Sequence, residues 1–189
     1  MRTEYVGKVT DEKEKQQIWE LLCECDQEFW PPLSARNSSV QKDLRSGVPA
    51  EEQAGDTVQK PTVYFDEMIG QEFILSFDDE GDVAGFMTFK KDYTCDALRD
   101  FGTSLYITTI CVKKELRRQH IMSGLYDCME TTAAKACVCS RISTRTWSEN
   151  EAHMKGLQHR GYRLLAVLKD DRGPGIDTVY YGMEVRSFA

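Results

Sequence analysis

The stretch from Leu105 to Lys135 restricts the fold of this chain more than any other part of its sequence. It begins with LYITTICV, a run of apolar and β-branched residues that favours a strand over a helix. From about His120 the apolar residues fall three and four positions apart, as they do on one face of a helix. A charged, irregular segment, residues 113–119, lies between the two patterns. The stretch therefore predicts a strand, a basic turn and a helix in succession.

A turn of this kind is suited to bind an anion. The first turn of a helix presents backbone N–H groups without intrahelical acceptors and carries a partial positive charge. Arg117 and Arg118 lie just before the predicted helix and add formal positive charge. We interpret this turn as the binding site of a phosphate-bearing ligand.

The remaining patterns predict a mixed α/β chain with the element order β-α-α-β-β-β-α-β-α-β-β. Thr10 or Asp11 is expected to cap the first helix, which the Pro31-Pro32 pair ends. The strands are expected at residues 4–9, 73–77, 83–89, 105–112, 141–147, 162–168 and 177–185, and the helices at residues 11–30, 61–70, 120–136 and 151–160. Such an order places antiparallel hairpins at each side of the sheet and parallel crossovers in its middle.

The sequence favours one domain, residues 1–189, and indicates no internal repeat or second domain. Residues 34–61 are polar and are expected to form a mobile loop or insertion within it. In that segment Val40 to Leu44 predicts a helical turn, and Gly47 to Gln59 predicts a mobile loop.

Charge and cysteine content limit the partners of the chain. The net charge of −7 disfavours a general nucleic-acid binder, although an acidic surface is compatible with amines or basic peptides. The sequence lacks an apolar leader and a long apolar run, which predicts a cytoplasmic protein without a membrane partner. Its seven cysteines are expected to be reduced, and the two C-x-C pairs are interpreted as small buried hydrophobes rather than zinc ligands.

The segment VKKELRRQHIMSGL resembles the acyl-CoA-binding motif of the GNAT-type N-acetyltransferases. Val112, Arg117, Ile121 and Leu125 fall in register with that motif, whereas two bulky residues stand where the family usually has small ones, namely His120 and Met122. A second register starting at Gln119 keeps Gly124 as the last glycine but shifts the apolar positions. We prefer the first register.

A second landmark, WSENEAHMKGLQHRGYRLL, resembles the family segment in which an asparagine caps a helix that a Gly-aromatic pair ends. Asn150, Gly161 and Tyr162 stand at the matching positions. A purely structural cap remains an equal alternative for Asn150. Leu157 replaces the tyrosine that the family uses as a proposed acid for the leaving thiolate, so that role is not transferred.

The resemblance covers essentially the whole chain and implies a GNAT-like fold, a mixed sheet of about seven strands flanked by helices. It implies acetyl-CoA as co-substrate, with no metal. The implied cofactor-binding residues lie on the end of the strand, in the turn and at the second landmark, namely Ile110, Cys111, Val112, Arg117, Arg118, Gln119, His120, Ile121, Met122, Ser123, Gly124 and Asn150.

The catalytic residues are left unassigned. Asp66, Glu67, Glu72 and Glu149 are candidate bases, and Glu149 is preferred because it adjoins Asn150. Cys111 is interpreted as a core cysteine rather than a nucleophile. His153 and His159 are expected on the exposed face of their helix, and Tyr162 in the core. Tyr180 and Tyr181 should point to opposite faces of their strand.

The expected activity is transfer of an acetyl group from acetyl-CoA to a primary amine of a small molecule or peptide. The alternative is a catalytically degenerate acyl-CoA-binding or protein-interaction module on the same fold, which the residues at positions 120, 122 and 157 favour. A nucleic-acid-binding protein is disfavoured by the charge, and homodimerisation is left open.

Overall fold

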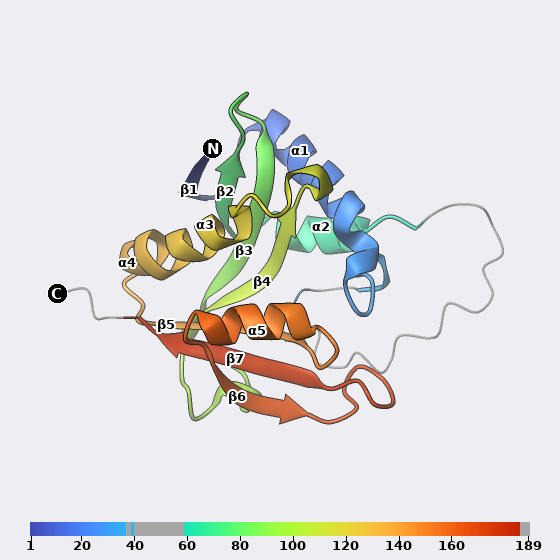
Figure 1. Ribbon diagram of the computed structural model, residues 1–189, viewed down its shortest axis with the longest axis vertical. Coiled ribbons are helices and arrows are strands. Elements are labelled where there is room, and N and C mark those ends of the chain that lie inside the picture. Colours follow the sequence, from blue (N-terminus) through green and yellow to red (C-terminus); the bar gives the residue numbers. More distant parts are fainter. Residues whose placement is uncertain (37–38, 40–58, 186–189) are drawn as a thin grey trace.

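A computed structural model shows how the elements are arranged (Figure 1), and it describes residues 1–36, 39 and 59–185. Its strands are β1 (Arg2–Gly7), β2 (Glu72–Phe77), β3 (Val83–Tyr93), β4 (Ser104–Val112), β5 (Arg141–Trp147), β6 (Arg163–Leu168) and β7 (Thr178–Glu184). Its helices are α1 (Glu12–Cys25), α2 (Thr62–Met68), α3 (Ile121–Cys128), α4 (Ala134–Ala136) and α5 (Glu151–His159). The expected order of elements is confirmed. The predictions for Val40 to Leu44 and for Gly47 to Gln59 fall outside the described residues, apart from Gln59 itself.

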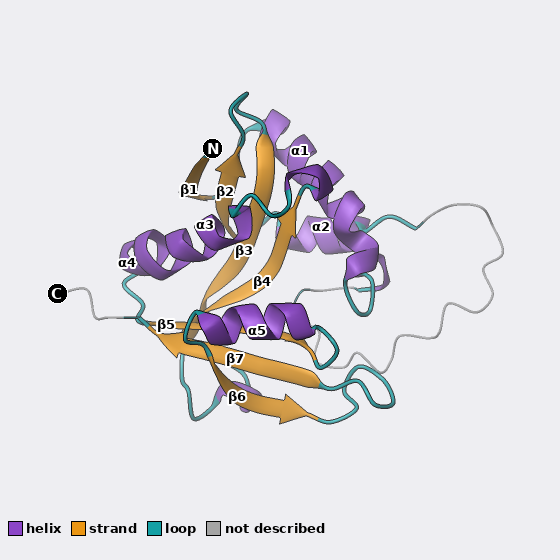
Figure 2. Ribbon diagram, viewed as in Figure 1, coloured by secondary structure: helices purple, strands orange, loops and turns teal. Residues whose placement is uncertain are grey.

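The sheet has seven strands in the order β1-β2-β3-β4-β5-β7-β6 (Figure 2). Each pair of neighbours among these strands is antiparallel except β4 and β5, which are parallel. The mixed sheet expected from the sequence is therefore confirmed, with its parallel crossover in the middle.

Helices cover both faces of the sheet. On one face α3 and α5 pack over a core that includes Leu125, Leu157 and Tyr162. On the other face α1 and α2 pack over a second core, in which Leu22 and Tyr64 are fully buried. Figure 1 shows α3 and α5 on the near side, with α1 and α2 beyond the strands.

Local sequence explains the ends of the helices. Asp11 caps α1 by accepting a hydrogen bond of 2.9 Å from the Glu14 amide. The first helix is shorter than expected, because regular α-helix ends at Cys25 and a 3₁₀ turn, Asp26–Glu28, follows before the prolines. Helix α3 continues into α4 through a π-helical turn, Met129–Ala133, which the sequence pattern did not predict. Gly161 follows α5 with a φ of 90°, as expected for the residue after a helix end.

Candidate functional site

Strands β4 and β5 run apart after a short paired segment, and the site lies in this opening. Their pairing ends at Ile107 and Thr144. At the same point the register between β3 and β4 shifts, because Thr88 pairs with Thr109 and Phe89 pairs with Ile107. Thr108 is therefore the extra residue of a β-bulge, a feature that bends a strand and is frequent beside active sites. Beyond the bulge, the edge of β4 that faces β5 has no pairing with it.

A cavity of about 730 Å³ lies in the opening between the two strands. Residues 107–112 of β4 and residues 144–147 of β5 form its walls. The turn before α3 and the first residues of α3 lie at one end, and the start of α5 lies beside them. Cys25 and residues 28–29 border the cavity next to the α1 side.

The turn before α3 has the backbone conformation that glycine normally provides. Arg118 and His120 have φ values of 65° and 62°, in the left-handed region that side chains disfavour. His120 occupies the N-cap position of α3, and both it and Met122 are exposed. The side chains of His120 and Met122 line the rim of the cavity rather than a buried pocket, since 48% of Met122 is accessible. The sequence pattern identified position 120 as unusual but missed the same backbone conformation at Arg118.

The amides at the start of α3 are available to an anion. The first intrahelical hydrogen bond is donated by the Gly124 amide to the His120 carbonyl, at 3.0 Å. The amides of Ile121, Met122 and Ser123 precede it and therefore have no acceptor within the helix. All three residues line the cavity.

Arg117 is held by Glu28, the last residue of the 3₁₀ turn that follows α1. Its Nη2 donates to both carboxylate oxygens of Glu28, at 2.8 and 3.0 Å, and its Nε donates to the Val112 carbonyl at 3.3 Å. The hydrogen bond from Arg117 to Glu28 is the main reason why the pKa of Arg117 is raised. Both residues line the cavity, so an anion in the turn would compete with Glu28 for this guanidinium.

The predicted cofactor-binding residues lie mostly on this cavity. Ile110, Cys111, Val112, Arg117, Arg118, His120, Ile121, Met122, Ser123 and Asn150 all line it. Gln119 and Gly124 do not. Gln119 is exposed, and a side chain at Gly124 would face Thr3 on β1 instead.

Asn150 is the N-cap of α5, as expected. Its Oδ1 accepts from the His153 amide at 3.4 Å, and its Nδ2 donates to Thr146 Oγ1 at 3.1 Å. The amide group is therefore engaged in the cap while the residue lines the cavity. This geometry is compatible with both interpretations of Asn150, the structural cap and the ligand contact.

The expectation that His153 lies on an exposed face is wrong. Its side chain is half-buried, lines the cavity and lies 2.8 Å from the hydroxyl of Tyr126 on α3. Burial lowers the pKa of His153 to about 4, so the imidazole is neutral at physiological pH. His159 on the same helix is exposed, as expected. The helical pattern of α5 alone did not indicate that α3 packs against this face.

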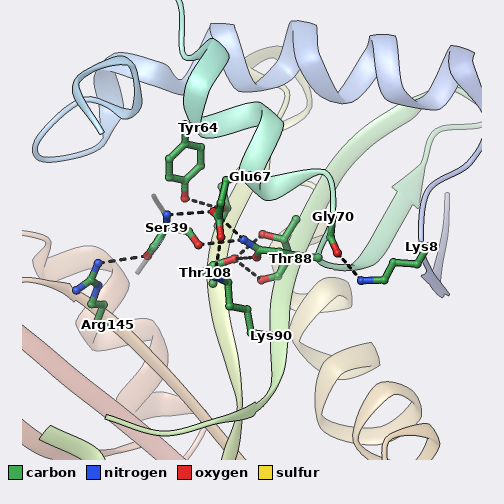
Figure 3. A network of polar contacts seen from close by, with 11 residues as sticks. Lys8, Ser39, Tyr64, Glu67, Gly70, Thr88, Lys90, Thr108 and Arg145 are labelled. Atoms are coloured by element: carbon green, nitrogen blue, oxygen red, sulfur yellow. Dashed lines mark hydrogen bonds and ion pairs between the residues drawn. The ribbon is translucent and has the colours of Figure 1, made fainter. Parts of the chain in front are cut away.

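The four candidate bases lie away from the cavity lining. Asp66 and Glu149 are exposed. Glu67 is bonded to Lys90 at 2.6 Å and to the Ser39 amide at 3.2 Å (Figure 3). Although burial by itself raises the pKa of Glu67, these bonds hold it below its ordinary value.

Glu72 is buried and paired on the β1 side of the sheet. It accepts from the Tyr5 hydroxyl at 2.6 Å and from Lys91 at 3.0 Å. Burial alone would raise the pKa of Glu72, but these donors lower it overall. Glu67 and Glu72 are therefore ion-pair partners rather than bases that face the opening.

The remaining expectations concern core residues. Cys111 is buried at 2% exposure in the core beneath α1 and α2, and Tyr162 is buried as expected. Tyr180 and Tyr181 pack into cores on opposite faces of the sheet, so both are buried.

Three arginines that the sequence analysis did not single out also line the cavity and lie close enough for their charges to interact: Arg36, Arg145 and Arg172. We call them the arginine cluster. Arg145 and Trp147 alternate along β5 with Thr144 and Thr146, and Thr146 bonds the cap of α5, so the cluster lies on the opposite face from α3 and α5. Arg145 Nη2 donates to the Ser39 carbonyl at 3.2 Å (Figure 3). The available signal was a charged residue in the middle of the strand RISTRTW.

Two negative findings apply to the described residues. No group of His, Cys, Asp and Glu side chains among them could hold a metal ion. No helix in residues 1–36 or 59–185 combines the length and the apolar character that a membrane span requires.

Comparisons with known proteins place this architecture among acetyltransferases. A model of the acetyltransferase (GNAT) family matches residues 15–162, and no curated protein matches the sequence. Protein smu.2055 of Streptococcus mutans is 15% identical with a TM-score of 0.62, over 98% of this chain and 100% of its own. An N-acetyltransferase of Staphylococcus aureus is 15% identical with a TM-score of 0.59, over 98% and 100% of the two chains. The yncA protein of Salmonella typhimurium, solved with its cofactor acetyl-CoA, is 13% identical with a TM-score of 0.60, over 99% and 96%.

Proposed function

This chain belongs to the GNAT family of acetyltransferases, and we propose that it transfers the acetyl group of acetyl-CoA directly to a primary amine of a small molecule or peptide. The observation that supports this proposal is the opening between β4 and β5, with a turn of free amides at one end. We further propose that residues 1–189 form one such domain and that it works in the cytoplasm, where its free cysteines stay reduced.

The residues of the turn and of α3 fit a diphosphate. The amides of Ile121, Met122 and Ser123 have no acceptor within the helix, their residues line the cavity, and the helix dipole adds to their attraction for an anion. Arg118 lines the same end and adds charge. The exposed positions of His120 and Met122 leave the amides accessible.

The splayed edge of β4 fits an extended, amide-bearing chain. Residues 110–112 follow the bulge at Thr108 and have no pairing with β5. Their backbone groups on that edge would pair with the amides of pantetheine as an additional strand does. The thioester would then lie in the opening, near Asn150 and the start of α5.

Acetyl transfer requires a group that takes a proton from the amine and a group that gives a proton to the thiolate. The neutral amine attacks the thioester carbon, a C–N bond forms, the C–S bond breaks, and the proton lost by the amine balances the one that the thiolate gains. Among the described residues that line the cavity, none is a tyrosine, and the one carboxylate, Glu28, is paired with Arg117. We therefore propose that water in the cavity carries both protons, with no dedicated side-chain base.

Calorimetry with CoA tests the binding site. In Met122→Pro an amide of the first helical turn is removed, and this amide has no acceptor within the helix, so its loss breaks no helical hydrogen bond. We expect the Kd for CoA to rise about tenfold, which corresponds to one charge-assisted hydrogen bond. Lys13→Pro at the equivalent position of α1, far from the cavity, is the matched control and should bind CoA like the unaltered chain. No CoA binding by the unaltered chain would refute the proposal.

Thiol release from acetyl-CoA with a panel of amines tests the reaction. Release that depends on an amine supports the transferase. Tight CoA binding without release for any amine would favour the alternative, an acyl-CoA-binding module in which the replacements at His120, Met122 and Leu157 have removed catalysis.

A further inference from the structure

The arginine cluster is the strongest concentration of buried positive charge on the cavity. Arg36 and Arg172 are each 7% exposed. Arg36 lies over the Phe29 ring at 5.7 Å, and Arg172 lies over the Trp147 ring at 5.8 Å. The aromatic rings and the backbone contacts orient the guanidinium groups of Arg36 and Arg172.

The Arg36 guanidinium has a hydrogen-bond donor without an acceptor among the described residues. Its Nε donates to the Pro31 carbonyl at 2.9 Å. Its Nη2 is buried and has no hydrogen-bond partner in the part of the chain that the structure describes. A buried donor without an acceptor is costly and is rare in native proteins. Such a group on the wall of a cavity therefore points to an acceptor that the protein binds.

Arg172 has a structural role that Arg36 lacks. It donates from Nε to Thr178 Oγ1 at 2.9 Å and from Nη1 to the Trp30 carbonyl. These bonds tie the β6–β7 connection to the segment after α1. They account for Arg172 as a structural clamp but leave the free donor of Arg36 unexplained.

The nearby carboxylates form no direct ion pair with these two arginines in the part of the chain that the structure describes. Asp26 instead accepts from the amide and the hydroxyl of Ser34, at 2.6 and 2.9 Å. Asp171 accepts from the Thr178 hydroxyl at 2.7 Å. Asp26 and Asp171 still attract Arg36 and Arg172 from a distance, but burial lowers the pKa of both arginines more than these charges raise it.

Burial and the neighbouring cations both lower the pKa of these arginines. Burial lowers the pKa of Arg36 to about 10, and the charge of Arg145 adds to the effect. Burial, together with the charges of Arg36 and Arg145, lowers the pKa of Arg172 to about 9. Both groups remain protonated at neutral pH. An anion in the cluster would relieve this mutual repulsion.

We propose, building on the function proposed above, that the acceptor amine carries an anionic oxygen group, a carboxylate or a phosphonate, which Arg36 binds within the arginine cluster. The acceptors are then amino acids or their phosphonate analogues. Arginine suits this task because its planar fork donates two parallel hydrogen bonds to such a group. The cluster lies on the sheet face opposite α3, so an acceptor held there approaches the opening between β4 and β5 from the side opposite the diphosphate turn.

Matched acceptors test this inference. Each amino acid of a panel that includes glycine and β-alanine is compared with its amide, which has nearly the same shape without the charge, and with the corresponding aminophosphonate. Thiol release from acetyl-CoA gives kcat/KM for each. We expect at least one acid or phosphonate to exceed its amide about 100-fold, as for a site built to bond a polar group.

The variant Arg36→Met removes the free donor and keeps the apolar stem. We expect kcat/KM for the preferred acid to fall at least about tenfold, with about twofold or less change for the amide and for the Kd of CoA. Arg163→Met on the exposed side of β6 is the control and should change none of these values. Equal activity on acids and amides, or a preference that survives Arg36→Met, would overturn the inference while the transferase assignment stands.

A binding measurement separates the two proposals. Thermal shifts are recorded for the unaltered chain and for Arg36→Met with β-alanine and with propylamine, without acetyl-CoA. If β-alanine stabilises the unaltered chain, propylamine does not, and Arg36→Met abolishes the effect, the anion site is supported. This result would stand even if CoA failed to bind and the transferase assignment were wrong. Equal shifts for both compounds, or a β-alanine shift unchanged by the substitution, count against the anion site.

Discussion

The neutral, half-buried His153 gives the most quantitative prediction for this protein. Its folded pKa of about 4 lies below the ordinary value of about 6.5. Because the unfolded chain then binds this proton more readily than the folded chain, stability is lost as the pH falls from about 6.5 toward 4. Above that range both states are neutral at this position, and the group makes no pH-dependent contribution.

The two pKa values set the size of the effect. Between about pH 7.5 and pH 5, linkage gives a loss of about 2 kcal/mol from this one group. In His153→Gln an amide oxygen can still accept from the Tyr126 hydroxyl, but the titration is removed. Urea unfolding at the two pH values should therefore show a stability loss smaller by about 2 kcal/mol in His153→Gln than in the unaltered chain.

His159→Gln is the matched control for this experiment. It replaces the same residue type on the same helix at an exposed position. Its loss of stability on acidification should equal that of the unaltered chain. If His153→Gln and the unaltered chain lose the same free energy of unfolding between the two pH values, the placement of His153 against Tyr126 is refuted.

Three further predictions concern the cavity. A methyl group at Gly85 would lie 2.9 Å from Ile121 Cγ2 and 3.0 Å from the Cys111 carbonyl oxygen. Gly85→Ala should therefore displace the start of α3, reduce the free energy of unfolding by about 1–3 kcal/mol and weaken CoA binding. Thermal unfolding measures the stability and calorimetry the Kd for CoA, and an unchanged Kd would contradict the close packing. Glu28→Gln should release Arg117 to the diphosphate and tighten CoA binding by up to about fivefold at low salt, with less effect at high salt; weaker binding in calorimetry would show that Glu28 does not compete. No unpaired carboxylate among the described residues lines the cavity, and His153 is neutral above a pH of about 4. We therefore expect log(kcat/KM) to rise with pH up to the pKa of the acceptor amine, without a break near pH 6.5. A pH-rate profile with such a break would reveal a histidine base.

The sequence predicted the elements well because each carries its own periodicity and its own caps. RISTRTW became β5 with the expected bounds, and Asp11 and Asn150 cap their helices through bonds to backbone amides. The turn between β4 and α3 was located for the same reason, since strand, turn and helix are contiguous in the chain.

The rest of the site depends on contacts between distant segments, which periodicity does not encode. Arg36, Arg145 and Arg172 converge from the segment after α1, from β5 and from the β6–β7 connection. His153 was misjudged because only the packing of α5 against α3 buries it. Two of the four candidate carboxylates, Glu67 and Glu72, are paired with lysines of β3, a contact that the sequence pattern does not encode.

The short parallel pairing in the middle of the sheet divides the molecule into two parts. Three residue pairs join β4 to β5, whereas seven join β5 to β7. Separation along this seam would therefore break fewer hydrogen bonds than disruption of either part, so amides beside it should exchange with solvent sooner than those deep in β2 or β3. A co-substrate in the opening would bond to the backbone of β4 on one side and to the start of α5 on the other. It would thereby link the two parts of the sheet beyond the point where the pairing of β4 and β5 ends.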